Sequence, residues 1–236
     1  MTIDIATHRN ILIKILKDIF TNHIIAPNLG FKGETAALLF YNLSRFSVDL
    51  DFDLLEPRKE LEIFEIVKKI LEKYGTIKAQ NKRYSLFFLL VYQDKTAGAQ
   101  NIKVEINKRN FGSQFQVKQY LGIAMQVMVP ADMAANKLVA MLERIGKTNR
   151  DIFDVWFFLS NNWPINQKII ELRTNKSYTE FLNNCIAELE QMSNRNILSG
   201  IGELLDTKQK AWAKSNLRTD TIFLLKLALS NQNKLG

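Results

Sequence analysis

The sequence predicts an α+β fold: a first half of helices and strands, the strands forming a mixed sheet, and an α-helical second half. Three observations support this class. Apolar residues recur at helical spacing in residues 8–20. Strand-like segments then cluster between residues 48 and 128. After Pro130 only helical patterns continue, separated by polar Asn/Ser clusters.

The first half alternates between the two kinds of element. The expected elements up to residue 74 are a helix at His8–Phe20, a break at Asn22–Gly30, a short buried helix at Thr35–Leu43, a strand at Val48–Leu54 and an amphipathic helix at Lys59–Tyr74. Further strands are expected at Gly75–Gln80, Tyr84–Tyr92, Asn101–Asn107 and within Gln114–Met128, with a hairpin loop at Asp94–Gln100.

The pattern changes from strand-like to helical near residue 125, so the expected domains are residues 1–125 and 126–236. The expected helices are Ala131–Arg144, Arg150–Leu159 and several more within Asn166–Lys234. Pro130 near the start and Gly146 after the end delimit the first of them.

Composition limits the class of protein. The chain has 236 residues, 47% of them hydrophobic, which is enough for a real core. A single cysteine, Cys185, excludes an internal disulfide, and the longest apolar run, Leu86–Tyr92, is too short to span a bilayer. We therefore expect a cytoplasmic protein without membrane contact. The net charge of +8 suits a polyanionic partner such as nucleic acid, although a merely basic soluble protein has the same charge.

Carboxylates line one face of the strand at residues 48–54. Successive strand residues point to opposite faces, so Asp49, Asp51 and Asp53 share one face. Aspartate is rare in strands, and three neighbouring carboxylates repel each other. A divalent cation such as Mg²⁺ offsets that repulsion directly, because it prefers oxygen ligands. The alternative is an edge strand with a solvated acidic face.

A third carboxylate lies on another expected strand. Lys103, Glu105 and Asn107 share a face of Asn101–Asn107. If this strand lies beside the first, Glu105 completes a metal site. Otherwise Glu105 is an ordinary polar residue paired with Lys103 or Lys108.

A glycine turn, Lys32-Gly33-Glu34-Thr35, precedes the helix upstream of the carboxylates. Glycine lets the backbone approach a phosphate, and a helix N-terminus favours an anion. The alternative is a simple helix N-cap.

The order of these motifs resembles the DNA polymerase β-like nucleotidyltransferase superfamily and, within it, the AbiEii/AbiGii toxin family. The resemblance covers about residues 10–160. It is carried by four stretches: Phe31–Leu38, Arg45–Phe52, Ala134–Arg144 and Arg150–Trp156.

The resemblance implies a nucleotidyltransferase core in residues 1–125 and a helical domain in residues 126–236 that lines the cleft. It implies that Asp49 and Asp51 are catalytic metal ligands for Mg²⁺ or Mn²⁺, to which the strand pattern adds Glu105 as a third candidate ligand. It also implies that Lys137 and Asp151 are further catalytic residues. The nucleotide-binding residues are then Lys32, Gly33, Thr35, Arg45, Ser47 and Lys137. Asp53 and Asp154 then have flanking and structural roles.

Each of these residues also has a plainer interpretation. Lys137 lies in an apolar helix and can keep its ammonium in water. Asp151 opens a helix, where the helix dipole alone favours an acid. Ser47 can cap the start of the strand, and Arg45 can form a surface ion pair.

Glu34 departs from the family pattern, which usually has Gly-Gly-Thr or Gly-Ser-Thr where this chain has Gly33-Glu34-Thr35. A carboxylate disfavours a neighbouring triphosphate. Either Glu34 points into solvent, or nucleotide binding is altered here.

The expected function is metal-dependent transfer of NMP from an NTP to an acceptor hydroxyl, by the toxin of a toxin–antitoxin pair. The acceptor is the 3′ end of tRNA or a protein side chain, and a cognate antitoxin is the expected partner. Two alternatives remain: a small-molecule nucleotidyltransferase of the antibiotic-modifying type, and a catalytically degenerate domain that binds nucleotide or RNA.

Overall fold

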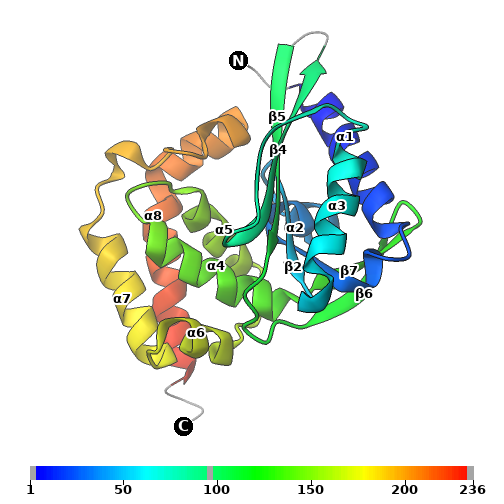
Figure 1. Cartoon of the computed structure of the whole chain (residues 1–236). Coiled ribbons are helices and arrows are strands. Elements are labelled where there is room, and N and C mark those ends of the chain that lie inside the picture. Colours follow the sequence, from blue (N-terminus) through cyan, green and yellow to red (C-terminus); the bar gives the residue numbers. More distant parts are fainter. Residues whose placement is uncertain (1–3, 95–97, 233–236) are drawn as a thin grey trace. The chain divides into compact units, whose positions relative to one another are not determined.

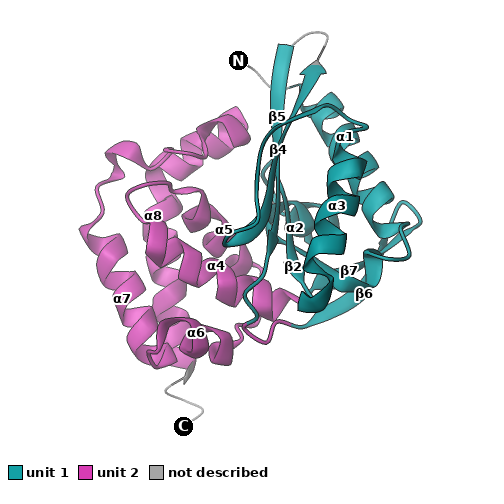
Figure 2. Cartoon of the chain, in the orientation of Figure 1, with its two compact units in different colours: residues 1–110, 114–128 teal, residues 111–113, 129–236 magenta. Residues whose placement is uncertain are grey.

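The computed structural model describes residues 4–94 and 98–232 of the chain. They form two compact units, drawn in different colours in Figure 2. Unit 1 comprises residues 1–110 and 114–128, and unit 2 comprises residues 111–113 and 129–236. Each unit is described by itself.

Unit 1 is a seven-stranded mixed sheet with helices (Figure 1). Its elements are α1 (Ile5–Phe20), β1 (Leu29–Lys32), α2 (Gly33–Tyr41), β2 (Leu50–Leu54), α3 (Glu60–Leu71), β3 (Thr76–Asn81), β4 (Ser85–Asp94), β5 (Gly98–Asn107), β6 (Phe115–Tyr120) and β7 (Ile123–Met128). The strand order is β3-β4-β5-β2-β1-β7-β6. Together with the helices of unit 2, this sheet confirms the predicted α+β class.

Aromatic residues fill the core between the sheet and its three helices. Phe52 of β2 packs against Phe31 of β1 and Phe20 of α1, with ring centroids 5.4 and 6.1 Å away. Phe64 of α3 stacks on Phe88 of β4 at 4.7 Å. Helix α2 joins the same layer, because its Phe40 meets the Phe31 ring edge-on. The helices therefore cover the face that carries Leu50, Phe52 and Leu54, and the aspartates lie on the opposite face.

Strand β2 lies in the middle of the sheet. It pairs antiparallel with β1 and parallel with β5, with Asp51 opposite Lys32 on one side and Glu105 on the other. The interpretation of this segment as an edge strand is therefore wrong. The conditional expectation that the Glu105 strand lies beside the aspartate strand is met by the observed register.

Two parts of the sheet differ from the sequence-based expectation. Strand β1 lies where Pro27 and Gly30 indicated only a break. A glycine is required at position 30 of this strand, because a Cβ there would lie 2.2 Å from the ring of Phe115. The single strand expected within 114–128 is a hairpin, β6 and β7, that turns at Leu121 and Gly122 with φ of 50° and 77°. Of the expected loop at Asp94–Gln100, residues 95–97 lie outside the described part, while residues 98–100 belong to β5.

Unit 2 is helical in its described residues. Its helices are α4 (Pro130–Arg144), α5 (Arg150–Ser160), α6 (Gln167–Thr174), α7 (Tyr178–Gln191) and α8 (Thr207–Gln232). They enclose one apolar core that includes Phe153, Phe181 and Cys185, all at most 1% exposed. The expected helical region reached Lys234, which lies outside the described residues.

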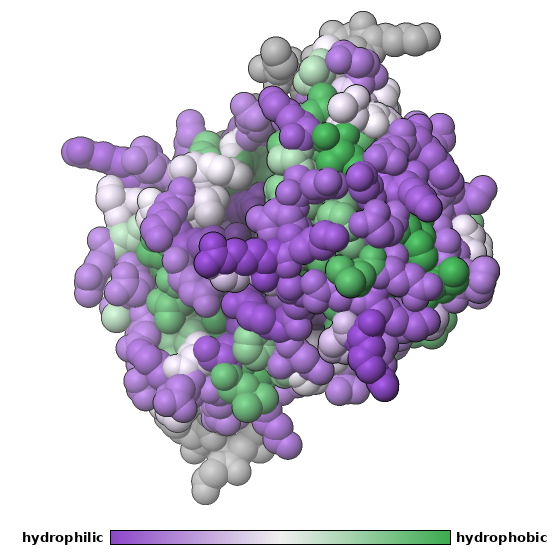
Figure 3. All heavy atoms as spheres, viewed as in Figure 1, coloured by the Kyte–Doolittle hydropathy of each residue, from purple (hydrophilic) through white to green (hydrophobic). Residues whose placement is uncertain are grey.

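Hydrophilic residues cover most of the face drawn in Figure 3, and the hydrophobic residues there form separate small areas. Among the described helices, none combines the length and the apolar character that crossing a membrane requires.

Candidate active site

Asp49, the residue directly before β2, is held in place through both its main chain and its side chain. The Thr35 hydroxyl donates a hydrogen bond to the Asp49 carbonyl oxygen. The main-chain N–H of Lys103 donates to Asp49 Oδ1 at 3.2 Å. Asp49 is thus tied both to α2 and to the neighbouring strand β5, which fixes where its carboxylate lies.

Strand β5 brings Glu105 next to Asp51. The two residues are register partners in the parallel pair β2/β5, and both side chains point to the face opposite the helices. The Ser85 hydroxyl of β4 donates to Glu105 Oε1 at 2.9 Å, which orients that carboxylate.

Lys103 places one positive charge among these three carboxylates. Its Nζ lies 3.5 Å from Asp51 Oδ1, 3.3 Å from Glu105 Oε2 and 4.0 Å from Asp49 Oδ2. Sequence reasoning gave Lys103 no role beyond a partner for Glu105. The signal was present, because Lys103 and Glu105 are two residues apart on one strand and so share a face.

Burial and mutual repulsion shift the titration of this cluster. Burial raises the pKa of Asp51 to about 6; Lys103 opposes that rise, and the charges of Glu34 and Asp49 add to it. Burial alone would lower the pKa of Lys103, but the surrounding carboxylates raise it. Burial alone would likewise raise the pKa of Glu105, which Lys103 and the Ser85 hydrogen bond instead lower.

Gly33 opens α2 directly beside Asp51. Its φ is +75°, in the left-handed region, and a Cβ there would stand 2.8 Å from Asp51 Oδ2. The residue at the N-cap, Lys32, makes no side-chain capping bond. The turn does form the N-cap of α2, as the simpler interpretation expected, but Lys32 leaves the first main-chain N–H groups of the helix without a side-chain cap.

Other residues predicted to bind nucleotide contact one another. The Thr35 and Ser47 hydroxyl oxygens lie 2.8 Å apart, and both residues are buried. The Lys32 ammonium forms an ion pair with Asp53. These contacts join α2, β1 and β2 around the aspartates.

The Glu34 carboxylate lies 3.6 Å from Arg45 Nη2, with the two side chains 11% and 1% exposed. Glu34 therefore does not point into solvent, and Arg45 does not form a surface pair. Because a buried carboxylate needs a positive partner, Arg45 offsets the charge that Glu34 adds beside the turn.

His8 of α1 forms a hydrogen bond with Val48, just before β2. Its Nε2 lies 3.0 Å from the Val48 carbonyl oxygen, which can only accept, so Nε2 carries the proton. Its Nδ1 then accepts a hydrogen bond from the Tyr92 hydroxyl at 2.7 Å. Burial lowers the pKa of His8 from its ordinary value. A neutral imidazole thus holds the residue that precedes Asp49.

In unit 2, α4 and α5 bring Lys137 and Asp151 together. Lys137 Nζ lies 2.9 Å from Asp151 Oδ1 and 3.1 Å from Asp154 Oδ2. Arg144 Nε lies 2.9 Å from Asp151 Oδ2 without hydrogen-bond geometry. Both aspartates are at most 1% exposed, so Lys137 is not a snorkelling lysine with its ammonium in water. Sequence reasoning missed Arg144, and it gave Asp154 a structural role without its contact to Lys137.

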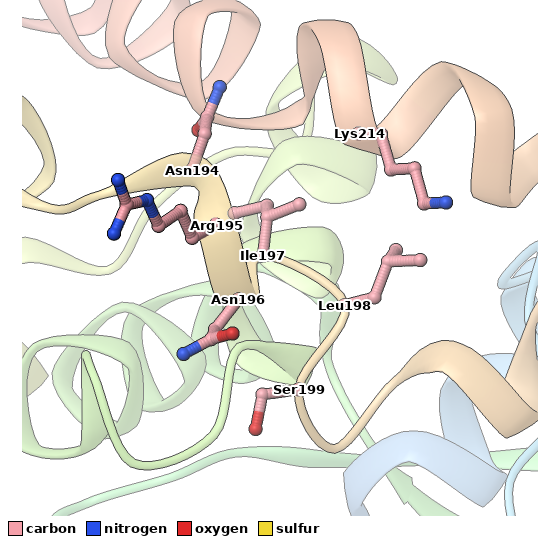
Figure 4. A pocket seen from close by; sticks show the side chains of 7 residues that line it. All are labelled: Asn194, Arg195, Asn196, Ile197, Leu198, Ser199 and Lys214. Carbon is pink, nitrogen blue, oxygen red and sulfur yellow. The ribbon is translucent and has the colours of Figure 1, made fainter.

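Unit 2 also has a hollow between α7 and α8, lined by Asn194, Arg195, Asn196, Ile197, Leu198, Ser199 and Lys214. Figure 4 shows the Arg195 and Lys214 side chains pointing away from each other. These two cations therefore do not converge on one ligand. None of the predicted site residues lines this hollow.

The carboxylate cluster of unit 1 is chemically suited to a divalent cation. Oxygens of Asp49, Asp51 and Glu105 each lie within 4.0 Å of Lys103 Nζ, so the three carboxylates share one positive neighbour. Carboxylate oxygens are the ligands that Mg²⁺ prefers.

Comparison with protein families gives a match to the nucleotidyl transferase AbiEii toxin family of type IV toxin–antitoxin systems, over residues 14–221. No curated protein sequence matches the chain significantly.

Solved structures with a similar fold include three chains from two bacteria. A candidate nucleotidyltransferase of H. pylori is 19% identical, with a TM-score of 0.65 and coverage of 100% of this chain and 99% of that one. JHP933 from Helicobacter pylori is 20% identical, with a TM-score of 0.55 and the same coverage. MenT4, a nucleotidyltransferase toxin from Mycobacterium tuberculosis, is 17% identical, with a TM-score of 0.60, covering 94% of this chain and 84% of that one.

Proposed function

Because the chain belongs to the AbiEii nucleotidyltransferase toxin family, we propose that it transfers NMP from an NTP to a hydroxyl at the 3′ end of an RNA, with Asp49 and Asp51 as metal ligands. Membership of this family makes the protein a nucleotidyltransferase and implies an NTP substrate and a cognate antitoxin. The acceptor, the metal and the roles of single residues are the proposed part.

The observation that carries the proposal is the cluster of Asp49, Asp51 and Glu105 around a single point on the face opposite the helices. Mg²⁺ or Mn²⁺ bound there would supply positive charge to the reacting phosphates and to the attacking hydroxyl. The pairing of β2 with β5 places Asp51 opposite Glu105, and the Lys103 N–H holds Asp49 against the same strand, so the protein positions the three carboxylates without the cation.

The turn at Gly33 suits the phosphates of the nucleotide. A side chain is absent where the backbone meets Asp51, and the N–H groups at the start of α2 have no side-chain cap. Main-chain donors at a helix N-terminus bind phosphate oxygens well. Lys32 adds a positive charge beside them, and Thr35 and Ser47 hold the turn against β2.

In unit 2, Lys137 is the proposed phosphate-binding cation, and Asp151 its positioning residue. The support is the buried ion-pair cluster: Asp151 and Asp154 fix the position of Lys137 Nζ, and Arg144 offsets their second negative charge. Two carboxylates that meet two cations at 2.9–3.1 Å give Lys137 a defined orientation.

An RNA acceptor is supported by a basic and aromatic edge of the sheet. Tyr84 is 72% exposed, and the Arg83 guanidinium lies 4.9 Å from the centre of its ring. Arg109 follows the end of β5, whose Asn107 pairs with Ser85 at the start of β4. Exposed aromatic rings beside arginines bind single-stranded nucleic acid by stacking and charge. Asn107 at this edge is two residues along β5 from Glu105, so the edge is close to the carboxylates.

Incorporation of radioactive label tests this proposal. The protein is incubated with Mg²⁺, each α-labelled NTP in turn and total tRNA, and RNA and protein are then separated. Label on RNA that disappears when the RNA 3′ end is blocked supports the proposal. Label on protein would redirect it to a protein acceptor, and no label with any NTP or metal would refute catalysis.

The matched control is the double variant Asp49→Ala/Asp51→Ala, which removes both proposed ligands and must still show the thermal unfolding of a folded protein. Arg58→Ala serves as a second control. Arg58 is an exposed residue that pairs with nearby Glu56, so the variant should transfer label as the parent does.

A further inference from the structure

We propose that the Lys103 ammonium competes with the divalent cation for the carboxylates of Asp49 and Asp51, and so sets the metal affinity of the site. The inference rests on the proposed function, because it concerns the cation that those aspartates would hold. It adds a residue whose effect runs opposite to that of a ligand: its removal strengthens metal binding.

The competition follows from which oxygens Lys103 contacts. Its Nζ faces Asp51 Oδ1, Asp49 Oδ2 and Glu105 Oε2 at 3.3–4.0 Å. The other Asp49 oxygen, Oδ1, accepts the main-chain N–H of Lys103. For Asp49 and Glu105, whose second oxygens accept from the Lys103 N–H and the Ser85 hydroxyl, the oxygen that faces Nζ is the one that a cation in the cluster would use. Mg²⁺ ligands lie at only about 2.0–2.1 Å, so an ammonium and a metal cannot both hold the centre.

Lys103 is also able to leave. Its side chain is 29% exposed, so a path to water exists, and four flexible carbons separate Nζ from a main chain that β2 and β4 hold on both sides. The ammonium can swing aside while β5 keeps its register. A divalent ion that enters the cluster repels the single positive charge and favours this movement.

Lys108, the residue directly after β5, provides the matched comparison. Its Nζ lies 3.1 Å from Glu60 Oε1 and donates to the Lys82 carbonyl oxygen at 2.7 Å. It therefore carries the same charge and forms a comparable ion pair, with a carboxylate outside the cluster. Changing Lys108 alters net charge without removing the competitor.

The test is a titration with Mn²⁺ alone, followed by electron paramagnetic resonance of the free ion, on the parent and four variants: Lys103→Met, Lys103→Gln, Lys103→Arg and Lys108→Met. We expect Lys103→Met and Lys103→Gln to bind Mn²⁺ at least about tenfold more tightly than the parent, which corresponds to about 1.4 kcal/mol. Lys103→Arg and Lys108→Met should bind as the parent does. Adding Asp49→Asn and Asp51→Asn to Lys103→Met should abolish the gain.

Unchanged or weaker Mn²⁺ binding in both uncharged variants, with thermal unfolding intact, would overturn the inference, as would an equal gain in Lys108→Met. Weaker NTP binding without tighter Mn²⁺ binding would overturn it too and assign Lys103 to the triphosphate. The label-transfer assay separates this result from the proposed function. Transfer by the parent without the gain refutes only the competition, whereas the gain without transfer refutes only the proposed reaction.

Discussion

The Asp51 carboxylate lies against the backbone of Gly33, with no room between them for a side chain. A Cβ at Gly33 would stand 2.8 Å from Asp51 Oδ2 and 3.0 Å from its Cβ, at a φ of +75°. The turn that opens α2 and the central strand β2 are therefore fitted to each other at the point where the phosphate and the cation are proposed to meet.

Gly33→Ala should reduce transfer much more than it reduces stability. The left-handed φ costs an alanine about 1–2 kcal/mol, and the new methyl group must displace the Asp51 carboxylate. We expect a loss of at least about tenfold in kcat/KM, equivalent to about 1.4 kcal/mol, with a melting temperature only a few degrees lower. Gly112→Ala has a similar φ, +77°, and nothing near its Cβ, so it should share the stability cost and keep the activity. Equal activity loss in both variants would contradict the role of the close approach.

Asp51→Asn should abolish transfer while stabilising the protein at pH 8. The pKa of Asp51 is raised from 3.8 to about 6, so the folded protein binds this proton more tightly than the unfolded chain. Above pH 6 the ionised carboxylate therefore costs stability, and the cost is relieved as pH falls through 6. Removing the charge should add about 1–3 kcal/mol to the free energy of unfolding at pH 8. Urea denaturation measures this, and a less stable Asp51→Asn variant would show that the carboxylate is well compensated in the metal-free protein.

His8 should make the protein sensitive to acid. Its folded-state pKa is lowered below the ordinary value of 6.5, so the unfolded chain takes up this proton first as pH falls. The contribution of His8 is fully present above pH 6.5 and is lost below it. His8→Gln should be less stable at pH 8, because its packing and hydrogen bonds are altered, but should lose less further stability between pH 7 and 5. Parallel urea midpoints for parent and variant across that range would refute this assignment; Asp51, whose effect has the opposite sign, cancels in the comparison.

Lys137→Met should destabilise the protein as well as inactivate it. The change leaves the buried carboxylates of Asp151 and Asp154 without their shared ammonium, although Arg144 still faces Asp151. Breaking a buried ion pair from one side costs about 3–5 kcal/mol. Lys226→Met removes a 2.7 Å pair with Glu190 in the same unit, at side chains 56% and 50% exposed, and should cost at most about 1 kcal/mol. Similar urea midpoints for the two variants would contradict the buried cluster.

The edge formed by Arg83, Tyr84 and Arg109 should affect RNA more than NTP. Tyr84→Ala should weaken binding of single-stranded RNA by about 1–3 kcal/mol through lost stacking. Arg83→Ala and Arg109→Ala should reduce the salt dependence of that binding, because fewer counterions are released. Fluorescence anisotropy with a labelled oligonucleotide measures both effects. An unchanged affinity in all three variants would remove this surface from the account.

The carboxylate face was predictable because a strand has a strict period of two. Val48–Leu54 alternates without exception, and its neighbour carries Glu105 in the same phase. Pairing partners are long-range, so the sequence could not exclude an edge position for β2. Strand β1 was missed for a related reason: it is only four residues long, and Gly30 is there to admit the Phe115 ring from another strand.

The side-chain contacts of the site residues could not be predicted from local sequence patterns, because they join residues that are far apart in the chain. The local pattern places Lys103 beside Glu105, but its contacts to Asp49 and Asp51 depend on the pairing of β5 with β2, and His8 meets Val48 across 40 residues. The β6–β7 turn could not be predicted, because its residue Leu121 adopts a φ of 50° and leucine is not a residue typical of turns. Glu34 departs from the usual pattern of the phosphate turn, and no local pattern predicts that Arg45 lies beside its carboxylate.

Pyrophosphate release measured together with nucleotide incorporation tests the central claim most directly, in the parent and in Asp49→Asn/Asp51→Asn. The account predicts that the parent releases one pyrophosphate for each NMP that becomes attached to the RNA 3′ end, only with a divalent cation. It predicts that the folded double variant does neither. Equal incorporation by the double variant, or by the parent in excess chelator, would contradict a metal-dependent nucleotidyl transfer at Asp49 and Asp51.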